Sequence, residues 1–256
     1  MSWLPQIGRI SIAIVQHLGA AGKFLPNVLP GIVVVYKRPK LLIQQLYSLG
    51  VMTVLIVVVA GLFVGMMLGF QGYHTLVDFG AESSLGLAVA LFLTKELGPV
   101  LTALLFAGRA GSAMTAEIGL MRMTQQLDAM KMMGVDPMIH IVAPRFFAVI
   151  FAMPLLAALF SVVGLGGGYI VAAGLLNVDP GSYWAAMQMG VDVYEDVWGG
   201  ILKSVVFGFV VSWISAFEGY YALPSANGIS TATTRAVVTA SLSVLGFDYL
   251  LTAIMF

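Results

Sequence analysis

Long apolar runs alternate with short polar segments along this chain, and the runs predict five membrane-spanning helices. Residues 51–70 form a run of 20 residues without a charge, and about 20 apolar residues are enough for a helix to cross the hydrocarbon core. The other predicted spans cover residues 85–108, 146–178, 199–221 and 236–256. Because the third run is longer than one span needs and contains Pro154 and a glycine cluster, we expect it to be tilted, kinked or broken.

A charged, helix-prone segment, EIGLMRMTQQLDAMKMMGVDP at residues 117–137, separates the second and third runs and must lie outside the membrane. Its apolar residues Leu120, Met123, Leu127 and Met130 recur at steps of three and four, which predicts one stripe along a short helix. The polar residues around the stripe are Glu117, Arg122, Gln125, Gln126, Asp128, Lys131 and Asp136. We interpret the segment as a helix at the membrane face that receives a soluble partner; a solvated linker helix is the alternative.

Among the polar segments, only three contain basic residues. They lie before the first run, in the connection at 109–145 and at Arg235, whereas the connections at 71–84 and 177–198 contain acids and no Lys or Arg. The positive-inside rule then predicts a cytoplasmic N-terminus, an outward-facing C-terminus and a cytoplasmic 117–137 segment.

The first 40 residues have the pattern of a helix that lies on the membrane. One helical face collects Trp3, Ile7, Ile10, Ile14 and Leu18, and polar residues lie largely opposite. This pattern favours an interfacial helix on the inner leaflet over a signal peptide. We therefore divide the chain into an interfacial helix with a basic junction, residues 1–40, and a five-span domain, residues 41–256.

Composition supports an all-α integral membrane protein. The chain is 60% hydrophobic and 9% charged, with a mean hydropathy of +0.98 and no net charge, far from the roughly 25% charged residues of soluble domains. The chain has no cysteine, which excludes disulfides and thiolate metal sites, and its three histidines show no metal-ligand spacing. The zero net charge gives no argument for nucleic acid. Since no phosphate-binding motif is present, we expect no catalytic, nucleotide or metal site, and energy for any transport must come from another subunit.

Four charged residues inside the predicted spans and one glycine series are candidate functional or packing features. Lys95 and Glu96 are adjacent in span two and point about 100° apart on a helix, so they are not expected to pair with each other. Glu96 is expected either to line a polar cavity or to brace spans through an ion pair. From their depths we predict that Lys203 pairs with Asp248, with Lys95 as the rival partner. The small-residue series Gly61, Gly65 and Gly69 predicts close helix packing, within the chain or across a dimer.

Several long motifs resemble the MlaE family of ABC transporter permeases. They are KELGPVLTALLFAGRAGSAMTAEIGLMRMTQQLDAMKMMGVDP from Lys95, LIQQLYSLGV from Leu42, GMMLGFQGY from Gly65, and the ending that starts LPSANGISTATTR at Leu223. The resemblance implies a homodimeric permease in the bacterial inner membrane that moves glycerophospholipids between inner and outer membranes and so maintains outer-membrane asymmetry. It implies as partners a cytoplasmic ATPase that uses ATP and Mg, a STAS-domain subunit and a periplasmic hexamer of MCE-domain subunits.

The resemblance also implies roles for particular segments. The segment 117–136 would be the helix that couples to the ATPase, and spans one, two and five would line a lipid cavity at the dimer centre. Two other readings stay open at this point. An ion-coupled secondary transporter would use Lys95, Glu96 and Asp248, although no internal repeat is visible; a purely structural membrane subunit would leave these charges unused.

Overall fold

The computed structural model describes residues 15–16 and 19–255, and every regular element in that part of the chain is helical. Six helical stretches are long and apolar enough to cross a membrane: Gly19–Lys37, Pro39–Val77, Glu82–Met123, Met138–Gly174, Val193–Tyr220 and Ala226–Met255. The last five overlap the five predicted spans, and the first, Gly19–Lys37, lies in the part of the chain that we assigned to an interfacial helix and basic junction. The predicted all-helical membrane class is therefore confirmed.

Most spans consist of consecutive helical pieces. Span one contains α3 (Pro39–Gln45) and α4 (Met52–Val77), and span two contains α5 (Leu85–Phe92), α6 (Gly98–Phe106) and α7 (Ser112–Met123), joined by π-helical turns. The remaining spans are α9 (Ala143–Gly174), α11 (Trp198–Tyr220) and α12 (Ala226–Met255), and the shorter helices are α2 (Ile32–Lys37), α8 (Gln126–Met132) and α10 (Pro180–Gly190). The third span is not broken as the sequence allowed, because α9 continues through Pro154.

The glycine series packs α4 against α9 within the chain. A Cβ added at Gly65 would lie 1.9 Å from the Gly164 carbonyl oxygen, and one at Gly61 or Gly69 would lie 2.9 Å from a carbonyl oxygen of α9. Such close backbone approach is what small residues permit in membrane helices. The structure therefore assigns the glycines to packing between spans one and three, a choice that the sequence left open.

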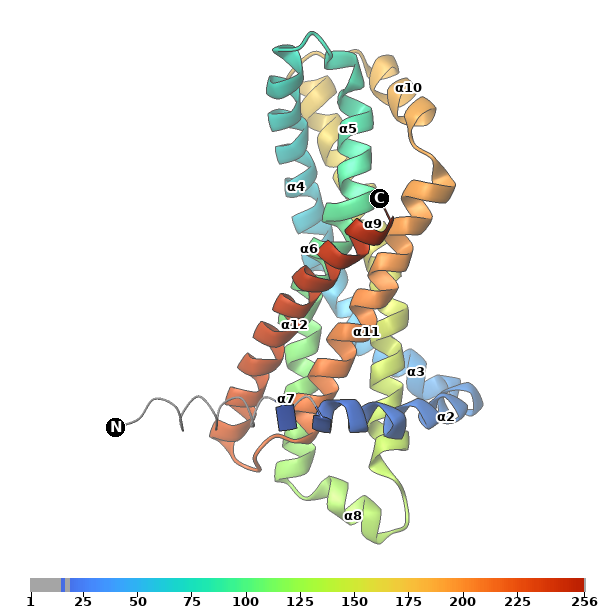
Figure 1. Ribbon diagram of the computed structural model, residues 1–256, viewed down its shortest axis with the longest axis vertical. Helices are drawn as coiled ribbons and strands as arrows, with labels where there is room; N and C mark the ends of the chain where they lie inside the picture. Colours follow the sequence, from blue (N-terminus) through green and yellow to red (C-terminus); the bar gives the residue numbers. More distant parts are fainter. Residues whose placement is uncertain (1–14, 17–18, 256) are drawn as a thin grey trace, which may run out of the picture.

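The spans do not all run the same way. In Figure 1, α4 and α9 follow the long axis of the molecule, whereas α12 crosses obliquely and ends near mid-height. The helical segment 19–37 lies across the long axis near the α8 end. It is anchored there by buried Phe24 and Val28 and by the Trp213 Nε1–H, which donates to the Ala21 carbonyl at 3.0 Å. The apolar face predicted from Trp3 to Leu18 lies outside the described residues.

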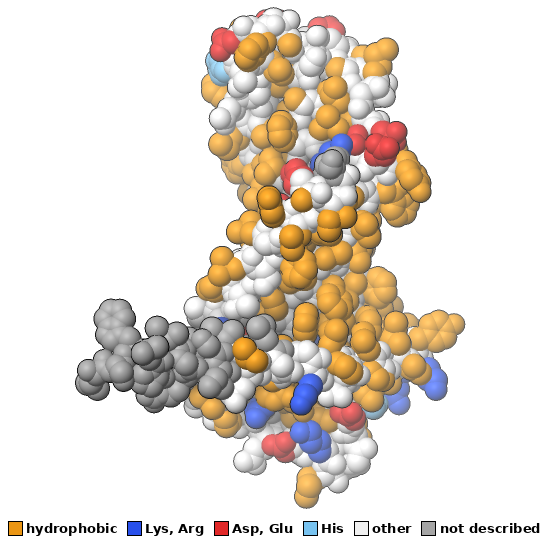
Figure 2. Space-filling view, in the orientation of Figure 1, with side chains coloured by type: hydrophobic (Ala, Val, Ile, Leu, Met, Phe, Trp, Pro, Cys, Tyr) orange, Lys and Arg blue, Asp and Glu red, His pale blue; other side chains and the backbone are white. Residues whose placement is uncertain are grey.

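Basic and acidic side chains gather toward opposite ends of the molecule. Figure 2 shows most of the visible Lys and Arg side chains near the α8 end, and most Asp and Glu toward the α10 end, with apolar side chains over the middle. This arrangement distinguishes the two ends of the molecule by charge.

Candidate functional site

Lys203 is the centre of a charge network inside the helical bundle. Its side chain is almost fully buried in α11, with 1% of its surface exposed. Its ammonium lies 2.8 Å from Glu96 Oε1 and 3.5 Å from Asp248 Oδ1, and it donates to Thr252 Oγ1 at 2.8 Å. The predicted contact between Lys203 and Asp248 is confirmed. The closer contact with Glu96, which joins spans two and four, was not predicted.

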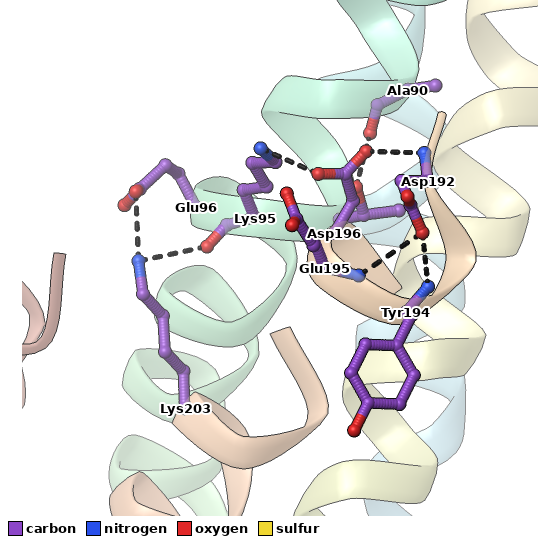
Figure 3. Close-up of polar contacts among 9 residues, drawn as sticks. Ala90, Lys95, Glu96, Asp192, Tyr194, Glu195, Asp196 and Lys203 are labelled. Atoms are coloured by element: carbon purple, nitrogen blue, oxygen red, sulfur yellow. Dashed lines mark hydrogen bonds and ion pairs between the residues drawn. The ribbon is translucent and has the colours of Figure 1, made fainter. Parts of the chain in front are cut away.

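Lys203 also has a backbone acceptor on span two. The Lys203 ammonium donates to the backbone carbonyl of Lys95 at 3.0 Å. In an α-helix this carbonyl would accept from residue 99, but Pro99 has no N–H. The Lys95 carbonyl and the Glu96 carboxylate both face the Lys203 ammonium (Figure 3).

The side chain of Lys95 has a separate partner. Its ammonium lies 2.6 Å from Asp196 Oδ1 in the turn before α11. Asp196 is held in turn by the Asp192 backbone N–H, which donates to it at 2.8 Å (Figure 3). The prediction that Lys95 and Glu96 each find their own partner is confirmed, and the rival pairing of Lys95 with Asp248 is wrong. Asp196 was missed because the sequence placed it in an outer connection.

The network contains more carboxylates than cations. Lys95 and Lys203 face Glu96, Asp196 and Asp248. Asp248 has the longest contact of the three, 3.5 Å from its Oδ1 to the Lys203 ammonium, and within the described residues this buried oxygen meets no hydrogen-bond geometry. An ionised group inside a membrane protein is costly unless it is paired. The network therefore braces spans two, four and five and leaves Asp248 as its least satisfied member.

An apolar cavity of about 220 Å³ lies beside the network, between spans two, three and four. Its lining includes Thr94, Pro99, Pro154, Ser161 and Gly200. This is a different place from the cavity that the family resemblance implies for spans one, two and five.

The turn between spans two and three differs from the single helix that we predicted. Gln125 has a φ of 59°, in the left-handed region, and it ends the helical path between α7 and α8. Leu120 and Met123 thus belong to α7, and Leu127 and Met130 to α8. The prediction of one continuous four-residue stripe is wrong, because the chain changes direction in its middle.

Four of the predicted partner-binding residues hold this turn in place. Glu117 accepts from Arg145 of α9 at 3.2 Å, and the Arg122 guanidinium donates to the Tyr220 carbonyl. Leu127 is 3% exposed and belongs to the hydrophobic core, and Asp136 accepts from the backbone N–H two residues later at 2.9 Å. A buried Leu127 cannot offer its side chain to a partner, which corrects its predicted role.

Other residues of the turn are available at its surface. Leu120 is half exposed, Lys131 is exposed beside Asp128, and Met132 and Met133 are 90% and 71% exposed. The sequence analysis missed the two methionines because they do not fall on the stripe of residues three and four apart. Exposed apolar side chains at the end of a structured, charged turn are typical of a protein contact.

These features define a multi-pass helical membrane protein with a buried ionic brace and a structured turn between its second and third spans. Residues 42–254 match the family described as Permease MlaE. The chain is 50% identical over 256 residues to the intermembrane phospholipid transport system permease protein MlaE of Haemophilus influenzae, covering 100% of this chain and 98% of that protein. It is 38% identical over 253 residues to a probable ABC transporter permease protein of Rickettsia bellii, covering 98% of this chain and 96% of that protein.

A plant protein is a more distant relative. The chloroplastic protein TRIGALACTOSYLDIACYLGLYCEROL 1 of Arabidopsis thaliana is 29% identical over 214 residues, covering 84% of this chain and 61% of that protein. The chain belongs to the MlaE permease family.

Proposed function

We propose that this chain is the membrane-spanning subunit of an ABC transporter that moves glycerophospholipids between the inner and outer membranes and maintains outer-membrane asymmetry. The observation that carries the proposal is the 50% identity, over the full length, to a protein named as an intermembrane phospholipid transport permease. ATP and Mg are used by a separate cytoplasmic ATPase subunit. The chain itself supplies the path for the lipid and the surface that receives the ATPase.

Two copies of the chain form the working unit. Only 11% of the membrane window of α12 is buried within the chain, and its exposed apolar side chains include Val238, Leu242, Leu245 and Leu250. A second copy facing α12 would enclose a lipid chamber between spans one, two and five. Asp248, the least satisfied carboxylate, lies on the helix that would line this chamber.

The two ends of the molecule receive different partners. The basic end with the α7–α8 turn faces the cytoplasm by the positive-inside rule, and the turn with Met132 and Met133 docks on the ATPase, which carries the STAS-domain subunit. The opposite, acidic end with α10 faces the periplasmic hexamer of MCE-domain subunits. The protein then resides in the inner membrane with its N-terminus in the cytoplasm.

The charge network favours this function over an ion-coupled secondary transporter. Lys95, Glu96 and Lys203 all form ion pairs that bridge different spans, which suits a brace better than an ion-coupling site. A structural subunit without transport would need neither the ATPase surface nor an exposed α12.

The test is lipid transfer in proteoliposomes. The permease is purified together with the ATP-binding subunit that is co-expressed with it, and transfer of a fluorescent phospholipid to acceptor vesicles is measured. Transfer that needs both ATP and the second subunit is the expected result. Transfer by the permease alone under an ion gradient would support the secondary transporter, and no transfer under any condition would support the structural subunit.

A further inference from the structure

An aromatic cluster lies at the C-terminal end of α11. Tyr220 is the last residue of that helix and is 9% exposed. Its ring centroid lies 5.9 Å from that of Phe24 and 5.3 Å from that of Tyr221, and Phe24 also meets Phe217 at 5.8 Å. The cluster joins the transverse segment 19–37 to the end of span four.

Two cations from the α7–α8 turn contact this cluster. The Arg122 Cζ lies 5.9 Å from the Tyr220 ring centroid and 6.0 Å from that of Tyr221, and the Lys131 Nζ lies 5.7 Å from the Tyr220 ring centroid. Attraction between a cation and an aromatic face acts within about 6 Å. Arg122 precedes the left-handed Gln125 and Lys131 follows it, so both arms of the turn hold the same tyrosine.

The Tyr220 side chain also acts on the protonation of Lys131. A hydrogen bond with the Tyr220 side chain raises the pKa of the Lys131 ammonium above its ordinary value. The ammonium is charged at neutral pH, and the upward direction of the shift agrees with a contact between the two side chains.

The helices behind this contact are packed closely. The Thr115 hydroxyl of α7 donates to the Ser215 carbonyl of α11 at 3.0 Å, and a Cβ added at Gly219 would lie 2.9 Å from the Thr115 carbonyl oxygen. Beyond Tyr220 the chain turns directly into α12, where Arg235 lies 3.6 Å from the Glu218 carboxylate of α11. Tyr220 thus stands between the α7–α8 turn and the start of span five.

We propose that Tyr220 is a positioning residue that passes movement of the α7–α8 turn to the α11–α12 turn, so that ATP hydrolysis by the partner moves span five. This inference rests on the proposed function, in which the α7–α8 turn receives the ATPase. The ring is the working part: it is held by the turn through Arg122 and Lys131, and by α11 through the backbone.

The first test compares ATPase activity with lipid transfer in the reconstituted complex. Tyr220→Leu should leave the ATPase bound and active while the ratio of lipid transferred to ATP hydrolysed falls about five- to tenfold, within the range of coupling between distant sites. Tyr220→Phe keeps the ring and should restore the wild-type ratio. The control is Tyr183→Leu in α10 at the opposite end, where Tyr183 is 1% exposed and its ring lies 5.7 Å from that of Tyr169 and 5.6 Å from that of Trp184. This variant should lower the yield of complex without changing the ratio.

The second test uses Lys131→Gln, which changes an exposed side chain and so leaves folding intact. This variant should lower the ratio, and in combination with Tyr220→Leu it should add little, because both substitutions remove the same contact. An unchanged ratio in Tyr220→Leu, a loss in Tyr220→Phe equal to that in Tyr220→Leu, or fully additive effects would each overturn the inference. Failure of the wild-type complex to transfer lipid with ATP would instead overturn the proposed function.

Discussion

Replacing Lys203 by methionine tests whether the charge network braces the bundle. Methionine has a similar length and is apolar, so Lys203→Met removes the ammonium while the buried site stays filled. Glu96 and Asp248 then lose the cation at 2.8 Å and 3.5 Å, and the Lys95 carbonyl and Thr252 lose a donor.

The expected cost can be worked out from the burial of the partners. Breaking a buried pair by removing one member costs about 3–5 kcal/mol. The side chains of Glu96 and Asp248 are 32% and 21% exposed, so water screens part of the loss and we expect about 3 kcal/mol, the lower end of that range. By the same reasoning Lys131→Met, which removes an exposed ion pair, should cost less than about 1 kcal/mol.

The assay is equilibrium unfolding of the purified permease in detergent. Adding Glu96→Gln to Lys203→Met should recover part of the stability, because the uncompensated carboxylate is then neutral. A simple exchange of charge between positions 203 and 248 should recover less, since it would place an acid beside Glu96. If Lys203→Met unfolds like the wild type, or if Glu96→Gln only adds to the loss, the brace is refuted.

Three further outcomes follow from the packing and the proposed orientation. Gly65→Ala should destabilise the protein by about 3 kcal/mol in the same unfolding assay, because its Cβ would overlap a carbonyl of α9. The control Gly166→Ala should be tolerated, because its Cβ would meet nothing within 4 Å. Equal effects of the two substitutions would contradict the contact between α4 and α9. Met132→Asp should reduce copurification of the ATPase with the fold intact, while Leu127→Asp should lower the yield of folded permease itself; normal copurification with Met132→Asp would exclude this surface. In the cysteine-free chain, Asp78→Cys should react with an impermeant thiol reagent in spheroplasts and Met132→Cys should not, and the reverse pattern would invert the topology.

The position of each span could be predicted because it depends on a local property. Backbone polar groups have no water partner in lipid, so an apolar run of sufficient length must form a helix. The runs at 51–70 and 236–256 therefore indicated spans without knowledge of their neighbours. The charged connection at 117–137 was recognised for the same reason.

The pairing of Lys203 with Asp248 was also accessible, since the rise per residue places both at a similar depth. Their other partners were not. Glu96 and Asp196 meet the lysines because of how the helices are rotated, and the Lys95 carbonyl accepts from Lys203 because spans two and four pack side by side.

The α7–α8 turn shows where periodicity fails. Steps of three and four predicted one stripe, but Gln125 adopts a left-handed conformation that this residue type seldom takes. The reversal allows Leu127 to enter the core, and the free energy of that burial is a property of the assembled bundle.

The sequence alone determined the class of this protein, the approximate positions of five long apolar helices, the charge difference between its ends and the family to which its motifs point. Each of these depends only on which residues follow one another along the chain. The tertiary structure decided which residue meets which: that the glycines of α4 receive α9, that Lys203 serves three spans, and that both arms of the α7–α8 turn hold Tyr220. Such contacts depend on the rotation and approach of helices, which only the packing of the whole chain sets.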